Sequence, residues 1–126
     1  MSLQIDSGAG AQAGLRIHVL DSLRGVVAEG LWVEVFRLGR GAEKRCSGRL
    51  GVDGALVDPA LHGKGFEAGE YEIVIHLGEY YRGLEPEESE HPFFECVTLR
   101  LEIADQGRPY DLPLRINPAG ICMAGA

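Results

Sequence analysis

The sequence has little positive charge and no long apolar run. Its 12 Lys and Arg residues are outnumbered by 19 Asp and Glu residues, which leaves a formal charge of −7. Phosphate binding needs clustered basic side chains, so we do not expect nucleic acid as a partner. No stretch of 18 or more apolar residues is present that could span a bilayer as a helix. We therefore do not expect a membrane partner either.

Cysteine is also scarce. The three cysteines, Cys46, Cys96 and Cys122, are an odd number and show neither a CxxC pair nor a Cys/His ligand spacing. This pattern indicates neither a disulfide framework nor a metal site, so free, reduced thiols and no cofactor are expected. The opening MSLQIDSGAGAQAG lacks the basic start and apolar core of a secretory signal. We interpret residues 1–14 as a flexible tail, residues 15–126 as one domain, and the cytoplasm as the location.

Alternating apolar and polar residues recur along the chain with turn residues between the runs. This period of two predicts an all-β domain, because one face of each strand is then apolar. A chain of this length supports one core, so we predict a two-sheet sandwich of seven to eight strands. The main runs lie at residues 15–19, 31–38, 70–77, 95–103 and 109–116, and KRCSGRL is a shorter one.

The connections between the runs are also predictable. One short helix is predicted at residues 78–84, and the acidic EPEESEHP (85–92) that follows is typical of an exposed loop. VDG is predicted to form a tight turn before the short run ALVD, and LHGKGFEAG to form a loop.

The first run poses a functional question. If Ile17 and Val19 point into the sandwich, Arg16 and His18 must point outward, because successive side chains of a strand alternate. The same argument in PYDLPLRI places Asp111 and Arg115 outward. Two runs far apart in the sequence thus carry charged or titratable groups on their outer faces.

Five strings in order resemble the transthyretin and 5-hydroxyisourate hydrolase family: HVLDSLRG (18–25), VEVFRL (33–38), GEYEIVIHLGEYYRGL (69–84), FFECVTLRLEI (93–103) and PYDLPLRINPAG (109–120). Together they span about residues 15–120. The resemblance implies two four-stranded sheets and a homotetramer, a dimer of dimers, around a central channel that the first and the last two strands face. In the hydrolases, the two mouths of this channel are active sites that open the ring of 5-hydroxyisourate, a product of urate oxidation. In vertebrate transthyretins, the same channel carries thyroid hormone. The fold does not choose between these activities.

The resemblance also implies a set of site residues, most of which are replaced here. The hydrolases use two histidines, an arginine and a closing Tyr-Arg-Gly-Ser. His18 matches the first histidine, but Ala55 follows the Asp-Gly of VDGAL where the arginine belongs, and Asp111 replaces the second histidine. The chain closes with PAGICMAGA, in which Met123, Ala124 and Ala126 offer only apolar contact. Arg49 lies six residues before Ala55 and would replace the arginine only through a shifted loop.

Three interpretations remain open. In a diverged hydrolase, Asp111 orients His18, His18 activates water, and Arg16 or Arg115 holds an anionic substrate of the urate-breakdown type. Alternatively, the tetramer binds a small planar or anionic ligand without catalysis, using these four polar residues around the apolar side chains of Leu20, Pro113 and Met123. In the third interpretation, the four residues form only a structural polar network.

Overall fold

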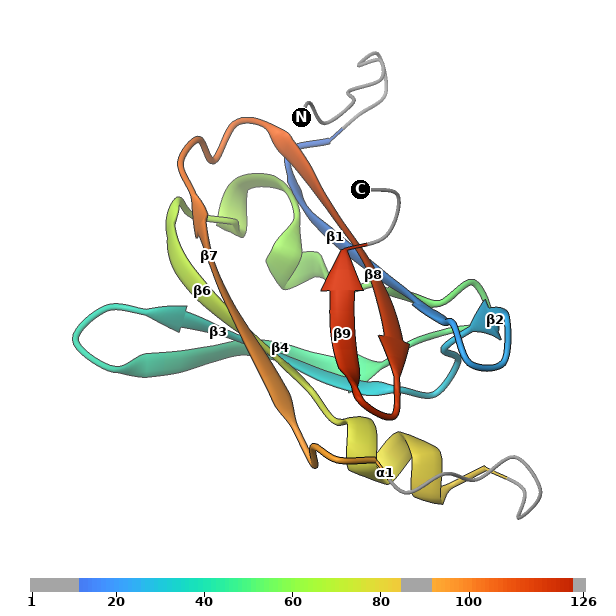
Figure 1. Ribbon diagram of the computed structural model, residues 1–126. Coiled ribbons are helices and arrows are strands. Elements are labelled where there is room, and N and C mark those ends of the chain that lie inside the picture. The colour runs from blue at the N-terminus through green and yellow to red at the C-terminus, as the bar shows by residue number, and fades with distance from the viewer. Residues whose placement is uncertain (1–11, 85–91, 124–126) are drawn as a thin grey trace.

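The computed structural model describes residues 12–84 and 92–123, which form a two-sheet β-sandwich with one short α-helix (Figure 1). The described residues contain nine strands, two of which are only two residues long. The predicted sandwich is therefore confirmed. Most of the predicted tail, and the acidic loop up to residue 91, lie outside the described residues.

The first sheet carries the outward faces that the sequence singles out. It has the order β2 (Val26–Val27), β1 (Gly14–Asp21), β8 (Pro109–Asn117) and β9 (Gly120–Met123), and β5 (Ala55–Leu56) also pairs with β1. The β1 and β8 strands run parallel over eight residue pairs, whereas the other pairings in this sheet are antiparallel. The first strand and the second-last strand are thus direct neighbours.

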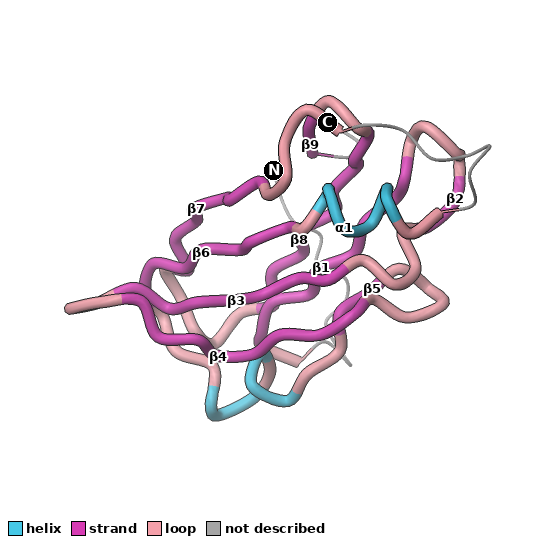
Figure 2. Tube along the Cα trace, turned by 90° about the horizontal axis from the view of Figure 1, so that it is seen from below, coloured by secondary structure: helices cyan, strands magenta, loops and turns pink. Residues whose placement is uncertain are grey.

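The second sheet covers the inner face of the first. Figure 2 shows its strands side by side in the order β7 (Val97–Ile103), β6 (Gly69–Ile75), β3 (Trp32–Leu38) and β4 (Ala42–Arg49). The helix α1 (Leu77–Arg82) follows β6 within one turn of the predicted position. Two 3-10 turns precede β6: η2 (Gly63–Gly65) lies within the predicted loop, and η1 (Pro59–Leu61) overlaps it only at Leu61. Within residues 12–84 and 92–123, no helix is long and apolar enough to cross a membrane.

The core consists of the inward faces that period-two alternation predicts. Ile17, Val33, Val35, Ile73 and Ile75 are completely buried between the sheets. Burying each such side chain contributes about 1.5–3 kcal/mol relative to leaving it exposed. The apolar residues of β7 are less enclosed, because only Ile103 of that strand is fully buried and the other three are partly buried.

A buried carboxylate fastens the end of β1 to the helix. Asp21 is fully buried, and its two oxygens accept hydrogen bonds from the hydroxyls of Tyr80 (2.8 Å) and Tyr81 (3.1 Å) and from the backbone N–H groups of Leu23 (3.0 Å) and Arg24 (3.2 Å). Burial, followed by the contact with this carboxylate, raises the pKa of Tyr80 to about 12. The phenol therefore remains a donor at neutral pH, and the turn after β1 is locked onto α1.

Replacing this carboxylate should destabilise the fold. In Asp21→Asn an amide NH2 replaces one accepting oxygen, so the free energy of unfolding should fall by about 1.5–3 kcal/mol, as for lost hydrogen bonds to a charged group. Urea denaturation followed by far-UV circular dichroism measures the change. The control Glu102→Gln, at an exposed position on β7, should stay within about 0.5 kcal/mol of wild type. Equal stability of the two variants would contradict this role of Asp21.

Candidate functional site

The outer face of the first sheet carries the residues that the sequence analysis placed there. On β1, Arg16 is exposed and His18 half-buried, while Ile17 and Val19 between and beside them are in the core. The parallel register sets His18 beside Pro113 of β8 and Leu20 beside Arg115. The predicted outward orientation of β1 and β8 at these positions is therefore confirmed.

Asp111 has a different partner from the one that the sequence suggests. The register places it directly beside Arg16, and its Oδ1 accepts a hydrogen bond from the Arg16 Nε at 3.0 Å. His18 lies two residues further along β1, beside Pro113, and the described residues contain no hydrogen bond between His18 and Asp111. The side chains of both Arg16 and Asp111 retain substantial exposure, 65% and 38%, so solvent screens the pair. A direct carboxylate–histidine pair is thus replaced by a carboxylate–guanidinium pair.

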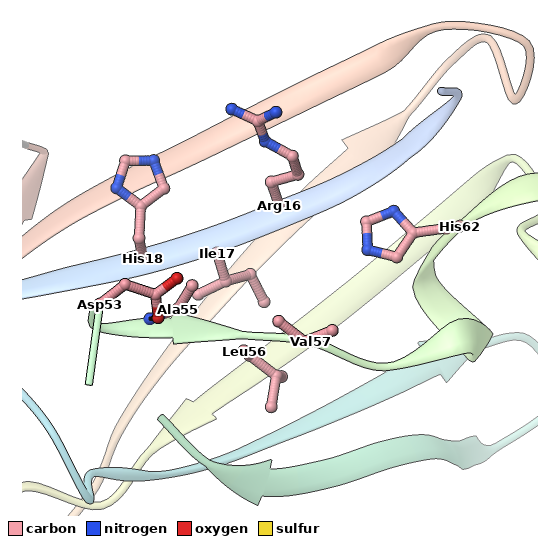
Figure 3. Close-up of a pocket in the computed structure, with 8 residues that line it drawn as sticks. All are labelled: Arg16, Ile17, His18, Asp53, Ala55, Leu56, Val57 and His62. Atoms are coloured by element: carbon pink, nitrogen blue, oxygen red, sulfur yellow. Dashed lines mark hydrogen bonds between the residues drawn. The ribbon is translucent and has the colours of Figure 1, made fainter. Parts of the chain in front are cut away.

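A cavity of about 420 Å³ lies along the outer side of β1 (Figure 3). It is bounded by β1, by the turn before β5, by β5 itself and by the loop that follows: Arg16, Ile17, His18, Asp53, Ala55, Leu56, Val57 and His62. Figure 3 shows the side chains of Arg16 and His18 standing on the same side of the strand. The cavity therefore presents a guanidinium, two imidazoles and the carboxylate of Asp53, whose Oδ1 accepts a hydrogen bond from the N–H of Ala55 at 3.1 Å.

The turn before β5 fixes Ala55 directly beside His18. The two residues are register partners, and the N–H of Val19 donates to the carbonyl of Gly54 at 2.9 Å. Gly54 has a φ of 75°, and a Cβ there would lie 2.8 Å from the Val27 side chain, so glycine is required at this close approach. The position at which the hydrolase arginine is expected thus lies at the cavity and carries only a methyl group.

His62 is a member of the cavity that sequence reasoning missed. It follows η1 and forms an isolated β-bridge with Gly14 at the start of β1. Burial first, and the charge of Arg16 second, lower its pKa below the ordinary 6.5, while Asp58 opposes them. The sole signal in the sequence is an imidazole within the predicted loop LHGKGFEAG, and no local pattern indicates that this loop folds back onto β1.

Three of the predicted site residues lie on the same sheet but do not line this cavity: Asp111, Arg115 and Met123. Arg115 is exposed on β8 beside Leu20 of β1 and Cys122 of β9. Met123 ends β9, where it pairs with Leu114 and is 48% exposed. Ala124 and Ala126 lie outside the described residues.

Arg49 does not take the place of the missing arginine. It lies at the end of β4, in the opposite sheet, where its guanidinium forms a two-pronged ion pair with Glu79 of α1 at 2.9 and 2.7 Å. It also donates to the carbonyl of Gly30 and stacks over the Trp32 ring at 5.2 Å. The loop shift that this replacement would require is absent, because the turn at Gly54 holds its expected place beside β1.

The cysteines are free in the structure. Burial raises the pKa of Cys46 to about 12. The Cys96 Sγ lies 3.5 Å from Nδ1 of His76, whose Nε2 is 2.8 Å from Glu34 Oε1. Burial and the neighbouring carboxylates of Glu95 and Glu34 raise the pKa of Cys96, which disfavours the thiolate. In residues 12–84 and 92–123, no cluster of three or more His, Cys, Asp or Glu side chains is arranged to hold a metal ion.

The sandwich and the polar face of its first strand define a transthyretin-like protein. Residues 15–123 match the HIUase/Transthyretin family. The chain is 36% identical over 107 residues to 5-hydroxyisourate hydrolase 2 of Rhizobium meliloti strain 1021, a match that covers 84% of this chain and 89% of that protein. The chain therefore belongs to the HIUase/Transthyretin family.

Two solved structures agree with this assignment. The crystal structure of (S)-allantoin synthase is 31% identical, with a TM-score of 0.75, over 90% of this chain. The chain corresponds to 43% of that protein, less than half of its length. The structure of Klebsiella pneumoniae 5-hydroxyisourate hydrolase, 23% identical, has a TM-score of 0.68 over 87% of this chain and 94% of that one. At this identity the second structure supports the fold alone.

The lowered pKa of His62 is directly measurable. We expect the C2 proton of His62 to titrate in NMR with a pKa below 6.5, because burial and the Arg16 charge disfavour the imidazolium. In Arg16→Gln the neighbouring positive charge is gone, so the pKa of His62 should move up. A pKa at or above 6.5 in the wild type, or no upward movement in the variant, would contradict this description of the cavity.

Proposed function

We propose that the cavity along β1 binds a small planar, anionic molecule of the urate-breakdown type and that the chain is a diverged ring-opening hydrolase. The observation that carries the proposal is that Arg16 and His18 stand together at one cavity on the outer face of β1. The relatives supply the substrate class, because one of them, 36% identical to this chain, is named a 5-hydroxyisourate hydrolase.

The binding part of the proposal rests on charge and shape. The Arg16 guanidinium is exposed at the cavity and can donate several hydrogen bonds to an anionic oxygen. Asp111 holds this guanidinium through Nε, which leaves the terminal nitrogens for a ligand. Ala55 and Val57 provide apolar surface against which a flat ring can lie. In this arrangement Asp111 positions Arg16 rather than His18.

The catalytic part rests on His18. Hydrolysis of a cyclic amide-type carbonyl needs a group that takes a proton from water and returns it to the leaving nitrogen. An imidazole does both near neutral pH, and His18 is half-buried at the cavity rather than enclosed in the core. We therefore assign the role of general base to His18.

A direct assay tests this function. Freshly generated 5-hydroxyisourate decays spontaneously, and its ultraviolet absorbance should fall faster with the wild-type chain present. His18→Ala should lower the enzymatic rate by about 10²–10⁴-fold, the usual contribution of a general base. The matched control is His76→Gln, an imidazole outside the cavity, which should keep the activity. Decay at the spontaneous rate with wild type would overturn the hydrolase proposal.

Non-catalytic binding is the second candidate, and the methyl group of Ala55 favours it. A methyl group cannot donate a hydrogen bond to a developing oxyanion. If catalysis is limited by this missing donor, Ala55→Arg should raise the rate of 5-hydroxyisourate decay several-fold, whereas Ala55→Gln, with a neutral donor, should raise it less. A pure binding protein would show no rate with any of the three chains, but urate or an aromatic carboxylate at millimolar concentration would raise its melting temperature.

We also propose that the protein forms a homotetramer, as the family resemblance implies. β7 and β9 each pair with one strand and have no partner among the described strands on the other side, so their edges are open to a second copy of the chain. Size-exclusion chromatography with light scattering should give four times the chain mass. A monomer mass at micromolar concentration would contradict the assembly. The cytoplasmic location stays a prediction.

A further inference from the structure

We propose that His62 is a second catalytic histidine of the cavity, which donates a ring N–H to the substrate carbonyl oxygen while His18 takes a proton from water. This inference rests on the proposed hydrolase function and adds to it a residue outside the predicted set. It supplies the group that Ala55 lacks, namely a hydrogen-bond donor at the oxygen where negative charge develops.

The placement of His62 is fixed by the backbone. The N–H of Gly63 donates to the carbonyl of Ala13 at 3.0 Å, and His62 bridges to Gly14. At Gly14, with a φ of 145°, a Cβ would lie 2.7 Å from His62 Nδ1 and 2.3 Å from the Leu61 carbonyl oxygen. The loop therefore reaches β1 because residue 14 has no side chain. The backbone of His62 is therefore held beside β1 before a substrate binds, and oxyanion stabilisation requires donors that are positioned in advance.

The arrangement around the cavity matches the proposed division of roles. Figure 3 shows Arg16 on β1 between His18 and His62, with the His62 ring extending from the loop toward the cavity. A planar molecule seated against Arg16 would thus have one imidazole toward each end. The two histidines come from different elements but line the same cavity. A substrate can therefore lie between them without displacing a core side chain.

The charge state of His62 fits the role of donor. Half-burial and Arg16 favour its neutral form, while the Asp58 carboxylate acts in the opposite direction. A neutral imidazole keeps one N–H for donation and places no second positive charge beside Arg16. Neutral histidines can act as such electrophiles because the bond to an oxyanion strengthens as charge develops.

The proton and electron changes balance within the cavity. His18 takes a proton from water as the water oxygen bonds to the carbonyl carbon, and the C=O electron pair moves to oxygen, which accepts the hydrogen bond from His62. The C=O bond then re-forms, the C–N bond of the ring breaks, and His18 returns the proton to the leaving nitrogen. One water is consumed, and both imidazoles end in their starting state.

Three variants test the role of His62 with 5-hydroxyisourate as substrate. His62→Ala removes the donor and should lower kcat by about 10²-fold with a much smaller change in KM, because the bond matters most in the transition state. His62→Gln keeps an N–H donor that cannot titrate and should retain most of the rate. Lys64→Ala, an exposed change in the same loop, is the matched control and should behave as wild type.

Each outcome has a separate meaning. If His62→Ala keeps the wild-type kcat, or if His62→Gln loses as much rate as His62→Ala, the role of His62 as a donor is overturned while the hydrolase proposal stands. If the wild-type chain itself does not accelerate the decay, the hydrolase proposal falls and takes this inference with it. A thermal melt of every variant shows whether a lost rate is only lost folding: equal melting temperatures with the predicted rates support the inference. A rate loss that tracks a lower melting temperature in both His62 variants contradicts it.

Discussion

The strand alternation of β1 is the constraint on which the rest of the structure depends. One face of this strand supplies Ile17 and Val19 to the core, and the other presents Arg16 and His18 to a cavity. Because the side-chain period of a strand is two, a slip of one residue would bury both polar groups and expose both apolar ones. The register that buries the core side chains is therefore the register that presents the site residues to the cavity. At the end of the strand, the hydrogen-bonded carboxylate of Asp21 connects β1 to α1.

The residues of the site come from segments that differ in their separation along the sequence. His18 and Arg16 follow from the pleat of one strand, whereas Ala55 follows a tight turn far along the chain, where the carbonyl of Gly54 accepts the N–H of Val19. Asp111 comes from a parallel neighbour far along the chain. Its pairing with Arg16 leaves His18 without a carboxylate partner among the described residues, and this favours a mechanism in which the imidazole works beside a held guanidinium.

These sequence separations explain which features of the fold and the site could be predicted from the sequence. Alternation and turn residues sufficed for the sandwich and for the outward face of β1, because each depends on neighbours in the sequence. The position of Ala55 was expected only from the family resemblance, because its pairing with His18 joins two distant parts of the chain. The partner of Asp111 depends on the register between two parallel strands. Alternation fixes the face on which a side chain lies, but a shift of the register by two residues leaves that face unchanged. His62 depends on a loop that closes onto β1 through Gly14, a contact across 48 residues that no local period indicates. The family resemblance fixes neither feature, since Asp111 replaces an implied histidine and the resemblance implies no site residue at position 62.

The most direct measurement of the central claim is the response of the histidine rings to a planar anion. NMR spectra of the full chain, recorded while urate is added, report His18, His62 and His76 separately. We predict that the ring signals of His18 and His62 shift together and saturate at one urate concentration, while those of His76, outside the cavity, do not shift. Unchanged signals of His18 and His62 at saturating urate, or a larger response at His76, would contradict the claim that the outer face of β1 is the binding site.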